Sequence, residues 1–369
     1  MNRILLLCFI HGFKGGSDTF GAFPEHLRAL VNHGIPHVDV RVIIYPKYET
    51  RGQLDECVCF FNTWLRQKVI DIDVEIRLRS ASTEPSIQVV LVGHSMGGIV
   101  AADAVRTLYL VSKFPTSSSS QDNSVVFPKI QGVLTFDTPF LGISPGVLTN
   151  ISPNSSVLTQ IGRITKPFWG FKDAMQDETY GKSSYASTSK DNSSSSLPTD
   201  IPTPMSTLQG WSKATTLAGT VAALATVTTA AYWHWDSVLK GWSWIDSHLE
   251  FVKCLLDEDS LRGRLADMEI LNHKLNMEFG NFYTRLGKNA ANSDSGALPT
   301  DKRSKTFCKL SEDPDVLHWQ EAVNTEAKNE IQAHTAMFFP KENPGYYTLS
   351  EEARDLILTW SRNGNFDST

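Results

Sequence analysis

The sequence contains little cysteine. Its 369 residues include only five cysteines, scattered along the chain, so a small disulfide-stapled fold is excluded. Only Cys57 and Cys59 lie close together, and they lack the paired cysteine or histidine spacing of a zinc site. We therefore expect a reducing compartment; the chemistry argued below needs neither a metal nor an organic cofactor.

A large excess of either charge is also absent. The formal net charge is −6 and no basic stripe runs along the chain, which excludes nucleic acid as a partner. With 41% hydrophobic and 20% charged residues, the chain can build a sizeable core. Its length fits one large domain or two modest ones.

Strand and helix patterns alternate over residues 4–142. Most of the strand-like runs are continuous and apolar, as expected for strands that are buried on both faces. Such alternation predicts an α/β fold with a mostly parallel sheet flanked by helices. The predicted strands are Ile4–Ile10, Val38–Tyr45, Ile87–Val92 and Ile130–Phe136, and the predicted helices are Phe23–Val31, Leu54–Val69 and Gly97–Val111.

The composition changes after Gly142. Residues 143–242 begin rich in Ser, Thr, Pro and Asn and end in an uncharged stretch, so we predict an insertion that divides one domain into residues 1–142 and 243–369. Beyond it, helices are predicted at Trp242–Leu256, Ser260–Met277, His318–Ile331 and Ser350–Ser361, the last with Ser350 as its N-cap, and strand-like runs at Asn281–Leu286 and Lys305–Leu310.

The strongest chemical signal is the run GHSMGG at residues 93–98. It directly follows a buried strand pattern and precedes a helix pattern, which is the setting of a nucleophile elbow. Gly93 and Gly97 avoid clashes in so tight a turn, and the helix N-terminus favours developing negative charge. Ser95 is therefore the predicted nucleophile, and Met96 is predicted to donate its backbone N–H to the oxyanion.

A second match to the same pattern, at residues 142–146, fails on mechanism. The residue after Ser144 is Pro145, which has no N–H to donate to an oxyanion. No helix pattern follows it. We interpret Ser144 as a loop residue.

A glycine-rich loop, HGFKGG at residues 11–16, ends the first predicted strand. Acyl transfer needs a second N–H donor that faces the tetrahedral oxygen. Gly12 would let the backbone approach, Phe13 is the expected donor, and His11 belongs to the same supporting loop.

A general base is expected late in the chain. His334 follows every predicted strand of the sheet, which gives it the last place in the order serine, acid, histidine. For the acid we favour Asp137, because it ends the strand beside the elbow strand and is therefore rigidly placed. Glu330 and Asp313 stay open as alternatives, as does a purely structural Asp137 that caps the following turn.

With these residues in hand, the chain resembles an α/β-hydrolase, and in particular a serine esterase or lipase family widespread in fungi. The resemblance implies Ser95 as nucleophile, His334 as base, Phe13 and Met96 as oxyanion donors, and an acyl ester of lipid type as substrate. One departure is Phe140, since lipases with a TPH segment carry histidine there. The matching segments are LLLCFIHGFKGG, VIIYPKYETRG, VVLVGHSMGGIVAAD, GVLTFDTPFLGI and AHTAMFFPKENPGYYTLSEEARDLILTW.

We expect a serine hydrolase that cleaves a lipid or small carboxylic ester through a Ser-His-acid triad. A non-catalytic, membrane-associated scaffold and an acyltransferase that uses the same residues are the alternatives. Ala214–Trp235 carries no charged side chain and precedes further tryptophans, so we expect a lid or interfacial helix, a transmembrane anchor or a packed helix there, with a membrane surface as partner.

The N-terminal run MNRILLLCFI resembles a short signal peptide. It continues directly into the HGFKGG loop without a cleavage site. We therefore expect an intracellular protein, in the cytoplasm or on an intracellular membrane.

Overall fold

The structure is a computed structural model, and its described residues all belong to one unit formed by Met1–Phe168 and Ser243–Thr369. The predicted insertion beyond Val147, with Ala214–Trp235 inside it, lies outside the described residues, as does the helix predicted at Trp242–Leu256 except for Leu255. The described residues are 3–13, 15–48, 54–79, 86–113, 127–144, 147, 255, 257–287, 305–311 and 319–363. Within these ranges, no helix combines the length and the apolarity that a membrane crossing requires.

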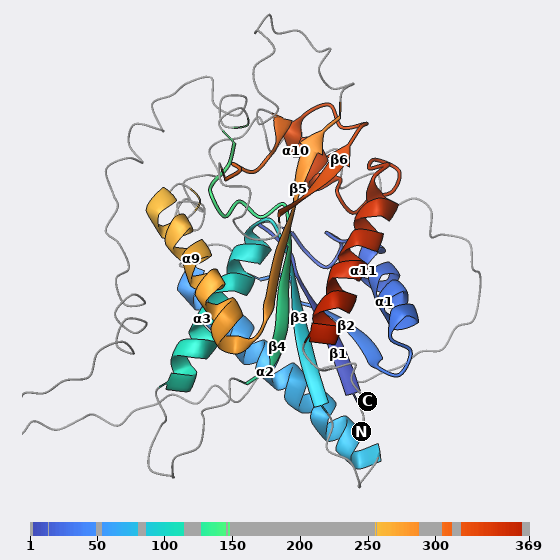
Figure 1. Ribbon diagram of the computed structural model, residues 1–369, viewed down its shortest axis with the longest axis vertical. Helices are drawn as coiled ribbons and strands as arrows, with labels where there is room; N and C mark the ends of the chain where they lie inside the picture. The colour runs from blue at the N-terminus through green and yellow to red at the C-terminus, as the bar shows by residue number, and fades with distance from the viewer. Residues whose placement is uncertain are drawn as a thin grey trace, which may run out of the picture. The chain divides into compact units, whose positions relative to one another are not determined.

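A single parallel sheet forms the centre of the described unit (Figure 1). Its six strands lie in the order β2-β1-β3-β4-β5-β6, and every neighbouring pair is parallel. The carboxyl ends of all the strands therefore meet at one edge, where α/β proteins bind their ligands. The strands are β1 Arg3–Ile10, β2 Asp39–Ile44, β3 Ser86–His94, β4 Ile130–Phe136, β5 Glu278–Leu286 and β6 Trp319–Asn324.

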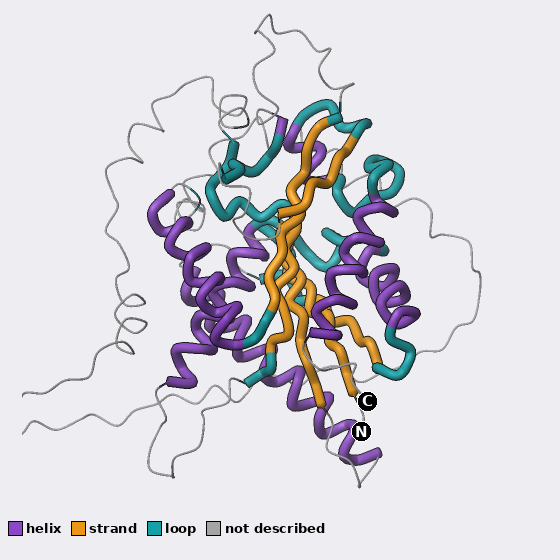
Figure 2. Tube along the Cα trace, in the orientation of Figure 1, coloured by secondary structure: helices purple, strands orange, loops and turns teal. Residues whose placement is uncertain are grey.

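Helices cover both faces of this sheet (Figure 2). Helices α1 and α11 pack on one face, and α2, α3 and α9 lie on the other (Figure 1). This arrangement explains why β1, β3 and β4 are buried on both faces and read as continuous apolar runs. The helices are α1 Phe23–Gly34, α2 Leu54–Arg79, α3 Met96–Lys113, α9 Glu258–Leu275, α10 Glu330–Thr335 and α11 Tyr346–Asn363.

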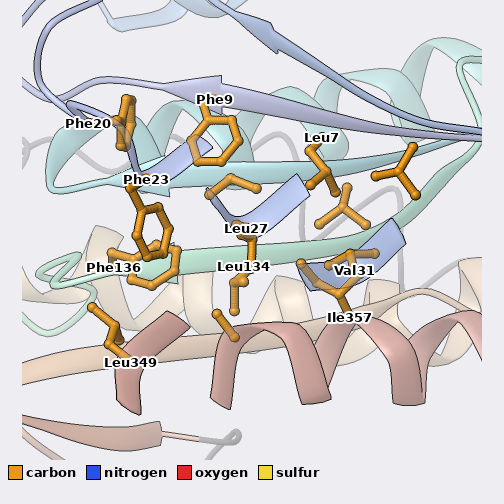
Figure 3. Close-up of a cluster of buried hydrophobic side chains, with 14 of the residues drawn as sticks. Leu7, Phe9, Phe20, Phe23, Leu27, Val31, Leu134, Phe136, Leu349 and Ile357 are labelled. Atoms are coloured by element: carbon orange, nitrogen blue, oxygen red, sulfur yellow. The ribbon is translucent and has the colours of Figure 1, made fainter. Parts of the chain in front are cut away.

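The core under α1 and α11 is rich in phenylalanine (Figure 3). Phe23 of α1 meets Phe136 of β4 with ring centroids 5.4 Å apart. Phe338, four residues after His334, packs on Phe23 at 4.8 Å and on Phe136 at 5.3 Å. Each fully buried side chain of this size stabilises the fold by about 1.5–3 kcal/mol. The segment that carries His334 is thus anchored in the main core.

The helix predicted at His318–Ile331 is wrong. Trp319–Asn324 forms the edge strand β6, which pairs in parallel with β5, and the helix α10 begins only at Glu330. The apolar residues Trp319, Ala322 and Val323 fit a helical stripe as well as an edge strand. Pairing with β5 decides between the two, and the local pattern does not contain that information.

Other elements also differ from prediction, and α2 continues to Arg79 where the pattern predicted an end at Val69. Helix α11 begins one turn early, and the Ser350 hydroxyl donates to the Tyr346 carbonyl inside the helix instead of capping it. The strand-like run Lys305–Leu310 forms only two isolated bridges, at Thr306 and Cys308.

A buried ion-pair network fastens α9 to α3. The Arg264 guanidinium donates to both oxygens of Asp103, with Nε–Oδ1 at 2.8 Å and Nη2–Oδ2 at 2.9 Å. Arg106 bridges Asp103 and Asp267, at 2.7 Å in each case. Burial raises the pKa of Asp103, but the Arg264 and Arg106 guanidiniums prevail and hold it below its ordinary value.

Replacing Arg264 by Met should lower the free energy of unfolding at pH 7 by about 3–5 kcal/mol, because Asp103 would lose its bidentate partner while buried. A lowered carboxylate pKa contributes stability above the unfolded value of about 3.9 and loses it as the pH falls through the folded value. The difference in the free energy of unfolding between wild type and Arg264→Met should therefore shrink towards pH 3. Burial raises the pKa of Asp267; Arg264 is the last of the charges that act on it, so its loss changes Asp267 less than Asp103.

Urea unfolding at pH 7 and pH 3 measures this, with Arg262→Met as the matched control. The Arg262 side chain is 67% exposed and lies 3.7 Å from Glu258, so its loss should cost under about 1 kcal/mol. Equal effects of the two substitutions would contradict a stabilising network.

Candidate active site

Ser95 occupies a strained turn between β3 and α3. Its φ of 55° lies in the left-handed region, which costs a residue with a Cβ about 1–3 kcal/mol and is typical of active sites. Gly97 permits the turn, because a Cβ there would lie 2.0 Å from the Ile10 carbonyl oxygen; Gly93 is buried on the strand side of the same turn. The predicted elbow geometry is therefore present, with Ser95 half-buried at its tip.

Hydrogen bonds fasten this turn to the end of β4. The Ser95 N–H donates to the Phe136 carbonyl, and the Thr138 hydroxyl donates to the Ser95 carbonyl, both at 2.9 Å. Met96 opens α3, so its N–H is one of the first-turn amides that a helix leaves without an internal partner. The N–H and the carbonyl of Ser95 are thus both fixed by the end of β4.

The loop after β1 passes directly against Ser95. A Cβ on Gly12 would lie 2.8 Å from the Cβ of Ser95 and 3.3 Å from its Oγ, so only glycine fits there. Phe13 follows and is half-buried. The structure thus brings the predicted loop to the predicted nucleophile.

His11 stiffens this loop. Its buried ring stacks on Tyr48 with centroids 4.6 Å apart, and the Tyr48 hydroxyl donates to the His11 carbonyl at 2.7 Å. The His11 Nδ1–H donates to the Gly12 carbonyl at 3.0 Å. Burial lowers the pKa of His11, so we infer a neutral, structural imidazole.

Asp137 is fully buried at the end of β4, with a left-handed φ of 48°. Its Oδ1 accepts from the Thr284 N–H at 2.9 Å and from the Cys308 thiol at 3.2 Å. Its Oδ2 accepts from the Thr284 hydroxyl and from the His334 ring at 2.7 Å. Four donors saturate this carboxylate, which is what a buried charge requires.

His334 lies in the short helix α10 and is 7% exposed. A carboxylate can only accept, so the Nδ1 of His334 carries the proton that reaches Asp137. In the neutral ring, Nε2 is then the basic nitrogen. That tautomer is the one a general base of a serine nucleophile needs.

His94 lies beside His334, which the sequence did not indicate. Its Nε2–H donates to the His334 carbonyl at 3.2 Å, and the two rings stack 4.6 Å apart. Burial, followed by the nearness of His334, lowers the pKa of His94 well below its ordinary value. Because His94 directly precedes Ser95, this contact holds His334 next to the elbow.

The other sequence candidates are Ser144, Glu330 and Asp313. Ser144 is 3% exposed and its N–H donates to the Phe307 carbonyl at 2.8 Å, as fits a loop residue. Glu330 is half-buried at the first position of α10, and Asp313 lies outside the described residues. In the ranges that the structure describes, no cluster of three or more His, Cys, Asp or Glu side chains could hold a metal ion.

Comparison with protein families gives one match. Residues 2–167 match the family described as "Putative serine esterase (DUF676)". The matched range contains the loop after β1, Ser95 and Asp137, and it ends before His334. A comparison with curated protein sequences gave no match.

The solved structures described next have low sequence identity to this chain. Phospholipase PlaB from Legionella pneumophila is 16% identical with a TM-score of 0.27, and the match covers 42% of this chain and 29% of PlaB. The chain therefore matches less than a third of that protein's length.

Two further structures match over most of this chain. The peroxisomal α/β-hydrolase Lpx1 from Saccharomyces cerevisiae is 11% identical, with a TM-score of 0.38 and coverage of 97% and 78%. A carboxylesterase structure from Nitrososphaera gargenis is 12% identical, with a TM-score of 0.35 and coverage of 96% and 90%. Residues 2–167 of the chain match the serine esterase family named above, and the described residues form a parallel sheet with helices on both faces.

Proposed function

We propose that this protein is a serine esterase that cleaves carboxylic esters through an acyl-enzyme, with Ser95, His334 and Asp137 as its triad. The observation that carries the proposal is the buried hydrogen bond of 2.7 Å between His334 Nδ1 and Asp137 Oδ2. His94, which directly precedes Ser95, donates to the backbone carbonyl of the same histidine. The family match supports a hydrolase of ester substrates.

In this proposal, Ser95 Oγ attacks the acyl carbonyl while His334 Nε2 takes its proton. Asp137 keeps the Nδ1–H in place and stabilises the imidazolium that forms. The imidazolium then protonates the departing alkoxide, which leaves as the alcohol. Water, deprotonated by the same Nε2, attacks the acyl-enzyme and releases the carboxylic acid and Ser95.

The tetrahedral oxygen would be held by two backbone N–H groups. We assign these to Met96, at the start of α3, and to Phe13, in the loop that Gly12 brings against Ser95. One such donor contributes about 3–4 kcal/mol to catalysis in enzymes of this type. The positive end of the α3 dipole favours the same oxygen.

Replacing Ser95 by Ala should lower kcat for a short-chain nitrophenyl ester by about five to six orders of magnitude, because triad members act as a unit. The spectrophotometric assay should show full activity for Ser144→Ala, which removes a hydroxyl from the second GxSxG match. An active Ser95→Ala protein, or loss of activity only in Ser144→Ala, would contradict the proposed nucleophile. Full activity in both variants would favour another site on the chain.

We further propose a lipid-type acyl ester as substrate and a lipid surface as the place of encounter. The support is the uncharged segment Ala214–Trp235 and the tryptophans that follow it. An apolar segment inserted between the strands of a hydrolase fold suits a substrate that is presented in aggregates.

Deleting residues 205–240 should reduce hydrolysis of long-chain, aggregated esters far more than hydrolysis of short, soluble ones. The apolar segment would no longer contact the lipid surface, so vesicle binding measured by flotation should also fall. Deletion of the polar stretch Lys182–Ser196 is the control and should leave the ratio of the two activities unchanged. Equal loss of both activities with unchanged flotation would contradict the lipid-surface proposal.

A further inference from the structure

A short segment crosses the site beside the Asp137–His334 pair. Residues 305–311, called the clamp segment from here on, bridge Ile143 through Cys308 and Arg285 of β5 through Thr306. The Phe307 carbonyl also accepts from the Ser144 N–H at 2.8 Å. The clamp segment is therefore fixed by backbone contacts to the chain after β4 and to β5.

Cys308 directs its thiol at the carboxylate of Asp137. The side chain is fully buried, and Sγ lies 3.2 Å from Oδ1. Burial raises the pKa of Cys308 well above its ordinary value, so the sulfur keeps its proton and acts as the donor. This thiol is one of four donors to Asp137, and it lowers the negative charge that the carboxylate presents to His334.

Phe307, the preceding residue, lies flat against the imidazole of His334. The ring centroids are 3.7 Å apart and the planes differ by 18°. His94 stacks on the same imidazole at 4.6 Å, and two rings this close to one imidazole fit only on opposite faces of it. The plane of His334 is thereby fixed, and the aromatic face of Phe307 favours a positive charge on the ring.

We propose that Phe307 and Cys308 are positioning residues that hold the triad pair and set the proton affinity of His334 in opposite directions. Phe307 favours the imidazolium through its π face, whereas Cys308 disfavours it by withdrawing charge from Asp137. The inference rests on the proposed function, because it assigns both residues a role in the action of His334 as a base.

The pH dependence of kcat/KM for a short soluble ester tests this, since its ascending limb reports loss of the proton from the essential base. The titratable groups against His334 are Asp137 and His94, and Cys308 lies against Asp137. The lowered pKa of His94 and the raised pKa of Cys308 keep both uncharged over the assay range. The limb therefore belongs to the His334–Asp137 pair.

Phe307→Leu should move the ascending limb to lower pH by about half a unit, because the imidazolium loses the aromatic face. Cys308→Ala should move it to higher pH by a similar amount and lower kcat about three- to tenfold, because Asp137 loses a donor. Cys308→Ser, which restores an O–H donor, should return both quantities close to wild type. Cys8→Ala is the matched control, since it removes an equally buried thiol from β1 and should leave the profile unchanged.

Shifts in the same direction, or no shift in either variant, would overturn the proposal and leave the clamp segment a packing element. If Cys308→Ala does not fold, the pH profile of Phe307→Leu alone tests the proposal. An ascending limb at the wild-type pH in that variant overturns it. Fluorophosphonate labelling keeps the two proposals apart. A wild-type protein that is not labelled at Ser95 contradicts the proposed function itself, whereas labelled protein with unmoved profiles contradicts only the inference drawn here.

Discussion

The buried carboxylate of Asp137 is the constraint around which the edge of the sheet is built. Moving a carboxylate out of water costs several kcal/mol unless partners compensate for the lost hydration. Asp137 has four donors, which come from Thr284 of β5, from Cys308 and from His334 of α10. Its charge can therefore be kept only when segments far apart in the sequence are assembled together.

This dependence joins the fold to the proposed chemistry. Phe338 and Phe136 share the core with Phe23, so the chain beside the Asp137–His334 pair is fixed by apolar packing. The polar contacts then set the orientation of His334 within that frame. A site supported in this way can hold the histidine within the narrow range of positions that proton transfer needs.

The continuous apolar runs of β1, β3 and β4 made the parallel sheet predictable from the sequence, and the GHSMGG run placed Ser95 on its turn. Asp137 could be favoured over Glu330 because a strand end is a rigid position. The structure places Asp137, not Glu330, against His334.

Other parts of the site have no local signature. Three residues contact the Asp137–His334 pair only after β4, β5 and α10 have been brought together: Thr284, Phe307 and Cys308. No spacing in the sequence predicts these contacts. For the same reason β6 was predicted as a helix, because its apolar pattern fits both states and only pairing with β5 chooses between them. The contact of His94 with His334 likewise has no signal in the sequence, and the two rings stack in the structure.

The most direct test of the account is the kcat/KM of Asp137→Asn for a short soluble ester, measured beside that of Glu330→Gln. An asparagine at this position would keep most of the shape of the site while no longer stabilising the imidazolium, so a loss of about 10³–10⁴-fold is predicted, with Glu330→Gln close to wild type. Unfolding measurements would establish that both variants are folded. A folded Asp137→Asn protein of nearly full activity, or a large loss in Glu330→Gln alone, would contradict the central claim.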